Sequence, residues 1–250
     1  MKKSIVAFLM LIVIAIVCCS CQKSSSDGIK TTYNHLTGTL TVSGEGTVEN
    51  LLNHGESGKR IKRIIIEEGI EGIWNSFNGI SRLREIRFPS TLGGVYGSFN
   101  EVGVCRRVVL PTAVYSVEDS FNQCEKLSAL EIEGKIAANQ SFNSLAIEEL
   151  IIPENSKMAG VFNDCKNLKR IVVGENAAVE EYHYFSSNGE GYVDIEPDYS
   201  ENRAENFSGC SNHINVYRYL PKAIFEHSME DYNIIEVPEG TSWEDYLEKR

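Results

Sequence analysis

The chain has 250 residues, enough for one domain with a substantial core or for two small ones. Hydrophobic residues make up 42% of it and charged residues 24%, a composition that excludes wholesale disorder. The formal net charge of −11 makes nucleic acid a poor partner, because phosphate binding needs clustered Lys and Arg.

The first 20 residues have the pattern of a secretory signal. Lys2 and Lys3 precede an unbroken apolar run over residues 5–17, and small residues follow it. The run is shorter than the roughly 20 apolar residues that a membrane-spanning helix needs. Residues 1–20 are therefore predicted to be a signal peptide, with a single-pass membrane anchor as the alternative.

The end of this segment resembles the signal of bacterial lipoproteins, in which a peptidase cuts before a cysteine that then carries acyl chains. The resemblance assigns lipidation to Cys21, which follows the small Ser20. The family prefers a Leu-like residue three positions before the cysteine. Cys18 stands there for Cys21, whereas Ile16 stands there for Cys19, so Cys19 is the alternative. Two or more acyl chains would hold the protein firmly on a membrane.

Residues 21–34 are rich in polar side chains and are predicted to be a tether. A repeated pattern occupies the remainder of the chain, residues 35–250. A phenylalanine marks six units of this pattern: Phe77, Phe99, Phe121, Phe142, Phe162 and Phe207. The successive intervals are 22, 22, 21, 20 and 45 residues, and the long last interval predicts an insertion near residues 174–206.

Each unit also carries one alternating apolar segment after its phenylalanine. Apolar residues stand nine and eleven positions after the Phe, for example Val108 and Leu110, as a strand with one buried face requires. Pro89, Pro111 and Pro153 then follow three of these segments and should end the strands. One unit has too little surface for a core of its own, so the units must stack.

The pattern Leu-x-x-Ile-x-Phe-Pro at residues 83–89 resembles a leucine-rich repeat, and residues 121–132 are similar to the BspA-type repeat of bacterial surface proteins. The resemblance implies a leucine-rich-repeat solenoid with one parallel-sheet strand per repeat of about 22 residues and little helix. Residues 36–46 are similar to its N-terminal hairpin cap and residues 235–247 to its C-terminal cap. A parallel β-helix, whose turns usually carry several strands, is the rival architecture.

Cysteines in the repeat region occupy apolar columns of the pattern, which favours buried free thiols over disulfides or metal ligands. The region has no Cys-x-x-Cys pair, no nucleophile elbow and no phosphate loop. We therefore expect no catalytic residues, no metal and no cofactor, and we do not expect an enzyme.

Basic residues gather on the outward positions of the first three strands, in a protein that is otherwise acidic. They are Lys62, Arg63, Arg84, Arg87, Arg106 and Arg107, with Glu85 among them. One hypothesis is that this surface meets an anionic protein or glycan. The alternative is a solvated sheet face without a ligand.

The expected insertion is rich in aromatic residues. They are Tyr182, Tyr184, Phe185, Tyr192 and Tyr199. Such rings suit sugar stacking or protein contact, because they are apolar with a polar tip. The alternative is that they pack on the flank of the solenoid.

BspA-like proteins act as surface adhesins, so the resemblance implies a binding or adhesion lipoprotein at the cell surface or in the periplasm. It would recognise a protein or glycan through the sheet face or the insertion, and its membrane contact would be the N-terminal lipid. The expected location is the outer membrane, facing the periplasm or the exterior. A glycan-binding lipoprotein of a polysaccharide-uptake system is the alternative.

Overall fold

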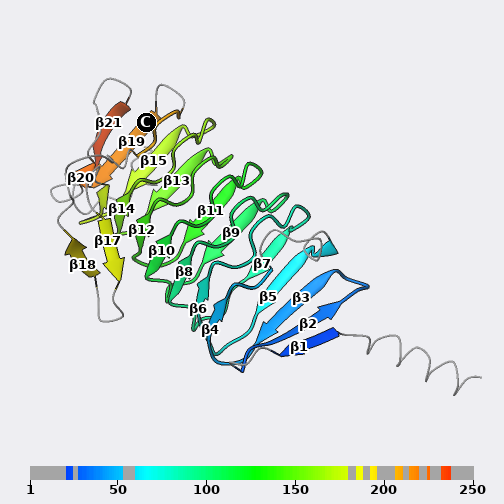
Figure 1. The fold of residues 1–250 in the computed structure, drawn as a ribbon. Helices are drawn as coiled ribbons and strands as arrows, with labels where there is room; N and C mark the ends of the chain where they lie inside the picture. Colours follow the sequence, from blue (N-terminus) through cyan, green and yellow to red (C-terminus); the bar gives the residue numbers. More distant parts are fainter. Residues whose placement is uncertain are drawn as a thin grey trace, which may run out of the picture.

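The computed structural model describes residues 21–24, 28–52, 60–179, 184–187, 192–195, 206–210, 214–219, 224–225 and 232–237. Within these residues every regular element is a β-strand, and the chain winds into a solenoid with two parallel sheets (Figure 1). The leucine-rich-repeat solenoid expected from the sequence is therefore confirmed. The predicted signal segment, residues 1–20, lies outside the described residues.

The first sheet contains the strands that the repeat pattern predicts. Its members are β3 (Thr39–Ser43), β5 (Arg63–Ile66), β7 (Glu85–Arg87), β9 (Arg107–Leu110), β11 (Ala129–Ile132), β13 (Glu149–Ile152), β15 (Arg170–Val173), β19 (Ile214–Tyr219) and β21 (Tyr232–Val237). Their pairing falls into three hydrogen-bonded stretches, ending at β7, β11 and β21. Every pair in the register from β3 onward is parallel.

A second sheet of eight strands runs along the other side of each coil. Its members are β4 (Gly46–Glu49), β6 (Ile70–Trp74), β8 (Gly94–Tyr96), β10 (Ser116–Glu118), β12 (Ala137–Asn139), β14 (Lys157–Ala159), β16 (Ala178–Val179) and β20 (Ile224–Phe225). The sequence predicts only one strand per repeat, so the second strand is a correction. Most of these strands have three residues or fewer, too few to show an alternating pattern in the sequence.

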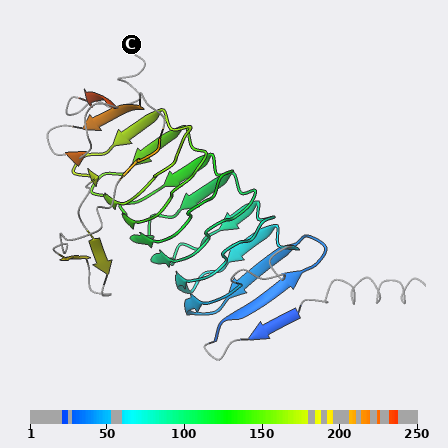
Figure 2. The ribbon, with the colours of Figure 1, turned by 45° about the horizontal axis from the view of Figure 1, so that its top comes forward.

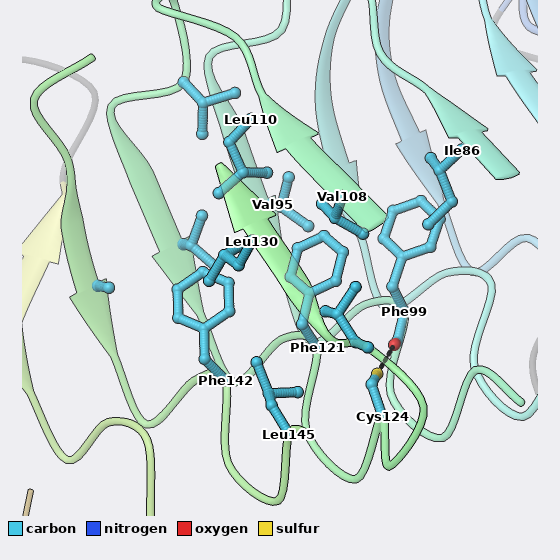
Figure 3. Close-up of a cluster of buried hydrophobic side chains, with 14 of the residues drawn as sticks. Ile86, Val95, Phe99, Val108, Leu110, Phe121, Cys124, Leu130, Phe142 and Leu145 are labelled. Atoms are coloured by element: carbon cyan, nitrogen blue, oxygen red, sulfur yellow. Dashed lines mark hydrogen bonds between the residues drawn. The ribbon is translucent and has the colours of Figure 1, made fainter. Parts of the chain in front are cut away.

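Two strands per coil bring the fold nearer to the rival β-helix than the sequence indicates. The core nevertheless follows the repeat. Val108 and Leu110 of β9 point inward toward Val95 of β8, and all three are at most 1% exposed (Figure 3). Pro111 ends β9, and its carbonyl accepts a hydrogen bond from the Val114 amide at 2.9 Å, which turns the chain toward the next strand.

The six recurring phenylalanines stack into one ladder through the core. Neighbouring ring centroids lie 5.1, 5.3, 5.7, 5.3 and 5.7 Å apart from Phe77 to Phe207, and all six rings are buried. Figure 3 shows three members, Phe99, Phe121 and Phe142, each contributed by its own coil. All six have a positive φ between 57° and 64°, a backbone conformation that costs an L-residue about 1–3 kcal/mol and that only strong packing maintains.

The Ser-Phe-Asn tripeptide supplies two hydrogen-bond ladders that flank the rings. The Ser98 hydroxyl oxygen accepts the Ser76 amide at 3.0 Å and donates its own proton to the Tyr96 carbonyl at 2.7 Å. The Asn100 side-chain oxygen accepts the Asn122 amide at 2.8 Å. These bonds satisfy backbone groups that the tight turn around each Phe would otherwise leave unpaired.

Both ends of the repeat region differ from its middle. β2 (Lys30–Asn34) pairs antiparallel with β3, so a hairpin caps this end as expected, but it spans residues 30–43 rather than 36–46; β1 (Cys21–Ser24) adds to its outer edge. Two strands thus lie within the expected tether, residues 21–34. At the other end β21 pairs with β19, and the rest of the expected C-terminal cap lies outside the described residues.

The insertion is shorter than the sequence indicates. β16 still completes a coil, because Lys157 pairs with Ala178, so the extra residues begin only after Val179. The repeat resumes at Asn206, whose side-chain oxygen accepts the Val161 amide at 3.0 Å across the whole insertion. Between them, β17 (Tyr184–Ser187) and β18 (Tyr192–Ile195) form an antiparallel hairpin that projects from the solenoid (Figure 2).

Candidate functional site

The outward face of the first sheet places the predicted basic residues side by side. Parallel pairing puts Arg63 opposite Glu85 and Ile65 opposite Arg87, so side chains from successive coils form rows across the sheet. Coils are about 5 Å apart, the spacing of adjacent strands. Arg63, Arg87 and Arg107 belong to the strands of three successive coils, and Lys62, Arg84 and Arg106 are exposed residues directly before these strands.

Three of these six residues form ion pairs with two carboxylates. The Glu85 carboxylate accepts from the Nε atoms of Arg63 and Arg87, each at 2.6 Å. Burial acts to raise the pKa of Glu85, but the hydrogen bonds from Arg87 and Arg63 outweigh it and hold the pKa below its usual range. One carboxylate thus offsets two guanidinium groups.

Arg107 is neutralised by Glu131 on the neighbouring strand. Its Nε and Nη2 atoms lie 2.8 and 2.7 Å from the two carboxylate oxygens, a bidentate arrangement. The hydrogen bond from Arg107 lowers the pKa of Glu131, and the same bond raises the pKa of Arg107. The sequence-based hypothesis counts Glu85 alone as an acid in the patch, and it misses this second compensating carboxylate.

Three basic residues remain, and we call them the basic column: Lys62, Arg84 and Arg106. Each is exposed and stands directly before its strand of the first sheet. The Arg84 amide donates to the Lys62 carbonyl at 2.8 Å, which fixes these two coils in register. In the part of the chain that the structure describes, none of the three has a carboxylate partner.

The basic character ends beyond the third of these coils. Ser128 occupies the next place in the column, and in the two coils after it Glu148 and Lys169 pair with each other at 2.9 Å. Three stacked cations at about 5 Å spacing create a local positive potential in an acidic protein. An anion bound there would relieve their mutual repulsion.

The aromatic residues of the insertion lie elsewhere on the molecule. Tyr184 and Phe185 belong to β17 and Tyr192 to β18, whereas Tyr182 and Tyr199 lie outside the described residues. Tyr184 pairs with Ile195 in the backbone register and Tyr192 with Ser187, so the two tyrosines occupy opposite ends of the hairpin. β17 lies beside β12 of the second sheet, far along the solenoid from the basic column (Figures 1 and 2).

The lipidation candidates lie at the edge of the described chain. Cys21 is the first residue of β1, opposite Tyr33 of the hairpin cap, and Cys19 lies outside the described residues. No helix among the described residues is long and apolar enough to cross a membrane.

The four cysteines of the repeat region are free thiols in the structure. Three are buried, and the Cys124 thiol donates to the Phe99 carbonyl at 3.3 Å (Figure 3). Burial raises the pKa of Cys124 to about 12. Cys210 is only half-buried, so the expectation of four buried thiols is wrong for that residue. In the described residues, no group of His, Cys, Asp and Glu side chains could hold a metal ion.

Sequence reasoning missed a group of aromatic side chains on the second sheet. Trp74 of β6 stacks on Tyr96 of β8 with centroids 4.3 Å apart, and Tyr115 lies beside them. Trp74 and Tyr96 end strands that the sequence does not predict, and Tyr115 directly precedes a third, so the repeat pattern could not show that these residues face solvent.

Comparison with known proteins identifies the repeat. The model of the BspA type leucine-rich repeat region, which comprises 6 copies, matches residues 56–160 and 138–237. No curated protein matches the chain. Similar solved structures include a leucine-rich repeat protein from Eubacterium ventriosum, with 13% identity, a TM-score of 0.41, and coverage of 82% of this chain and 68% of that one.

Two further structures are similar over much of their length. A leucine-rich cell surface protein from Faecalibacterium prausnitzii has 14% identity and a TM-score of 0.36, with 81% of this chain and 72% of that one covered. A leucine-rich repeat protein from T. pallidum has 13% identity and a TM-score of 0.33, with 60% and 71% covered. Since the repeat model matches well over half of the residues and the coils follow its period, the chain belongs to the BspA-type leucine-rich repeat family.

Proposed function

We propose that the protein is a lipid-anchored binding protein of the bacterial envelope and that it recognises an anionic partner through the basic column. The family supports a binding role, because BspA-type repeat proteins are in general surface proteins involved in binding or adhesion. The signal-like segment ending at Cys21 supports export and anchoring.

The observation that carries the proposal is the separation of paired from unpaired cations on one face. Arg63, Arg87 and Arg107 already have carboxylate partners, and a ligand would have to compete with those carboxylates. The basic column consists of exposed cations that have no such partner among the described residues, so an anion can approach them without breaking an ion pair seen there. Exposed charges of this kind mainly increase the rate at which an oppositely charged partner associates, and they make its binding depend on salt concentration.

The test replaces Lys62, Arg84 and Arg106 together by Ala in the full-length protein, purified in detergent. A matched control replaces Lys126, Lys135 and Lys166, which are also exposed, and changes the net charge by the same amount. Binding is measured to immobilised dextran sulfate, polygalacturonate and the acidic protein phosvitin. We expect loss of binding in the basic-column variant and near-normal binding in the control. Equal losses, or no loss in either variant, would refute the proposal.

The same experiment separates the two kinds of anionic partner. Retention on polygalacturonate but not on phosvitin would indicate a glycan, as in a polysaccharide-uptake system, and the reverse would indicate a protein. Anchoring is tested separately by metabolic labelling with an alkyne fatty acid. Label should disappear in Cys21→Ala and persist in Cys19→Ala, and the opposite pattern would assign Cys19. Persistent label in both single variants and in the double variant would refute lipidation of these residues.

A further inference from the structure

The second sheet carries an aromatic cluster that we define as Trp74, Tyr96 and Tyr115. Trp74 is 49% exposed and Tyr115 is 44% exposed, whereas the six recurring phenylalanines are buried in the core. Tyr96 is half-buried between Trp74 on β6 and the next coil. Exposed aromatic rings in a group mark binding surfaces more often than solitary ones do.

Glycines make the room in which these rings lie. A Cβ atom on Gly94 would stand 2.5 Å from Cε2 of Tyr96, and one on Gly93 would stand 2.7 Å from Cε1 of Tyr115. Neither glycine has a positive φ, so any residue could adopt its backbone conformation. Glycine matters at these two positions because it has no side chain, and the tyrosine rings pack against the backbone in the space that a Cβ atom would fill.

Carboxylates bracket the aromatic cluster along the same row. Glu49 of β4 pairs in register with Trp74, and Glu118 of β10 pairs with Tyr96. Desolvation is the main cause that raises the pKa of Tyr115. The neighbouring Tyr96 and the charge of Glu71 raise it further. The negative charge of these carboxylates disfavours an anionic ligand at the aromatic cluster.

Uncharged sugar chains fit this combination. A pyranose ring has an apolar C–H face that packs on an aromatic ring, and hydroxyls at its edge that donate to carboxylates. The rings of the aromatic cluster come from three successive coils, each about 5 Å from the next, so a chain lying along the solenoid would meet Trp74, Tyr96 and Tyr115 in turn. A cationic partner would also suit the carboxylates, and its binding would weaken in salt.

We propose that the aromatic cluster is a binding site for an uncharged carbohydrate chain, in which a sugar ring packs on Trp74 and hydroxyls donate to Glu49 and Glu118. This site lies on the second sheet and does not depend on the basic column of the first sheet. Its success or failure is therefore distinguishable from that of the anionic site.

The chain offers a direct optical readout. It has two tryptophans, Trp74 and Trp243, so Trp243→Phe leaves Trp74 as the sole indole in the full-length protein. In that background the emission is followed during titration with cellohexaose, xylohexaose, mannohexaose and maltohexaose. We expect at least one of them to shift or quench the emission, with an affinity that is unchanged by 0.5 M NaCl.

Variants then assign the effect to the cluster, with calorimetry replacing fluorescence. Trp74→Ala should weaken binding about tenfold or more, as truncation of a central aromatic anchor does. Gly93→Ala, which displaces the Tyr115 ring, should weaken it by a smaller factor. Ile151→Ala removes an exposed apolar side chain from the first sheet and should leave the affinity unchanged. Thermal unfolding of each variant verifies that it is folded.

Three results would overturn the proposal. The first is that none of the four hexasaccharides perturbs Trp74. The second is that Trp74→Ala and Ile151→Ala bind equally well in their folded forms. The third is binding that disappears in 0.5 M NaCl, which would identify a charged partner instead.

Discussion

Truncation of one ring in the phenylalanine ladder tests whether stacking between coils stabilises the solenoid. Phe121 lies between Phe99 and Phe142, with centroids 5.3 and 5.7 Å away, and is fully buried. Phe→Ala in a core costs about 3–5 kcal/mol, and each stacked pair contributes about 0.5–1.5 kcal/mol beyond burial. We therefore expect Phe121→Ala to lower the free energy of unfolding by about 4–5 kcal/mol.

The terminal ring provides the comparison. Phe77 stacks on Phe99 alone among the described residues, at 5.1 Å, so Phe77→Ala should cost about 1 kcal/mol less than Phe121→Ala. Urea unfolding followed by circular dichroism measures both. A defect in the middle also divides the row of coupled coils, so its transition should broaden. Costs below about 2 kcal/mol for Phe121→Ala, or equal costs at both positions, would refute the stacking argument.

Three further outcomes follow from other contacts. Gly103→Ala should strongly destabilise the fold, because its Cβ would stand 1.9 Å from the Ser81 carbonyl oxygen; an unchanged melting temperature would contradict this. Cys210 should be alkylated by iodoacetamide before the other repeat cysteines, because it is less buried and a hydrogen bond from Cys165 lowers its pKa; mass spectrometry of partly labelled protein checks the order. The lowered pKa of Glu131 contributes stability that is present above its unfolded pKa of 4.5 and is lost as pH falls through the lower folded value. Arg107→Ala should remove that part of the acid sensitivity, and identical stability–pH curves in the two proteins would argue against it.

The sequence predicts the first sheet well, because most of its strands alternate inward and outward positions and Pro89, Pro111 and Pro153 follow three of them. The residues around Phe99 and Phe121 repeat at 22, so their coils could be aligned by counting. The second sheet was not predictable as strands. Its members are short: Gly94–Tyr96, for example, has Val95 as its one buried apolar side chain, and a single residue shows no period.

The sequence also could not predict the backbone conformation at the recurring Phe residues or the contact between the coils on either side of the insertion. A positive φ at Phe is unexpected, since sterics favour Gly, Asn or Asp there, and only the assembled ladder maintains it. Cys165 and Cys210 are separated by 45 residues in the sequence, yet they belong to adjacent coils, because the Cys210 thiol donates to the Phe162 carbonyl at 3.1 Å and the insertion leaves the solenoid between them. Counting repeats without knowing where the insertion begins could not show this.

The sequence indicates which exposed basic residues adjoin the first sheet, but it does not show which of them form ion pairs. Lys62, Arg84 and Arg106 lie where the repeat places them, exposed on the first sheet. The pairing of Arg107 with Glu131 depends on side chains two columns apart on neighbouring strands, a diagonal that column-by-column reading overlooks. The residues that matter for an anionic partner are consequently half of those that the sequence indicates.

The salt dependence of binding to dextran sulfate tests the role of the basic column most directly. Affinity is measured for the unmodified protein and for the Lys62, Arg84 and Arg106 triple alanine variant over a series of NaCl concentrations. Each neutralised cation steepens the slope of log affinity against log salt by about one, so the unmodified protein should exceed the variant by about three. Equal slopes in the two proteins would contradict an anionic site at the basic column.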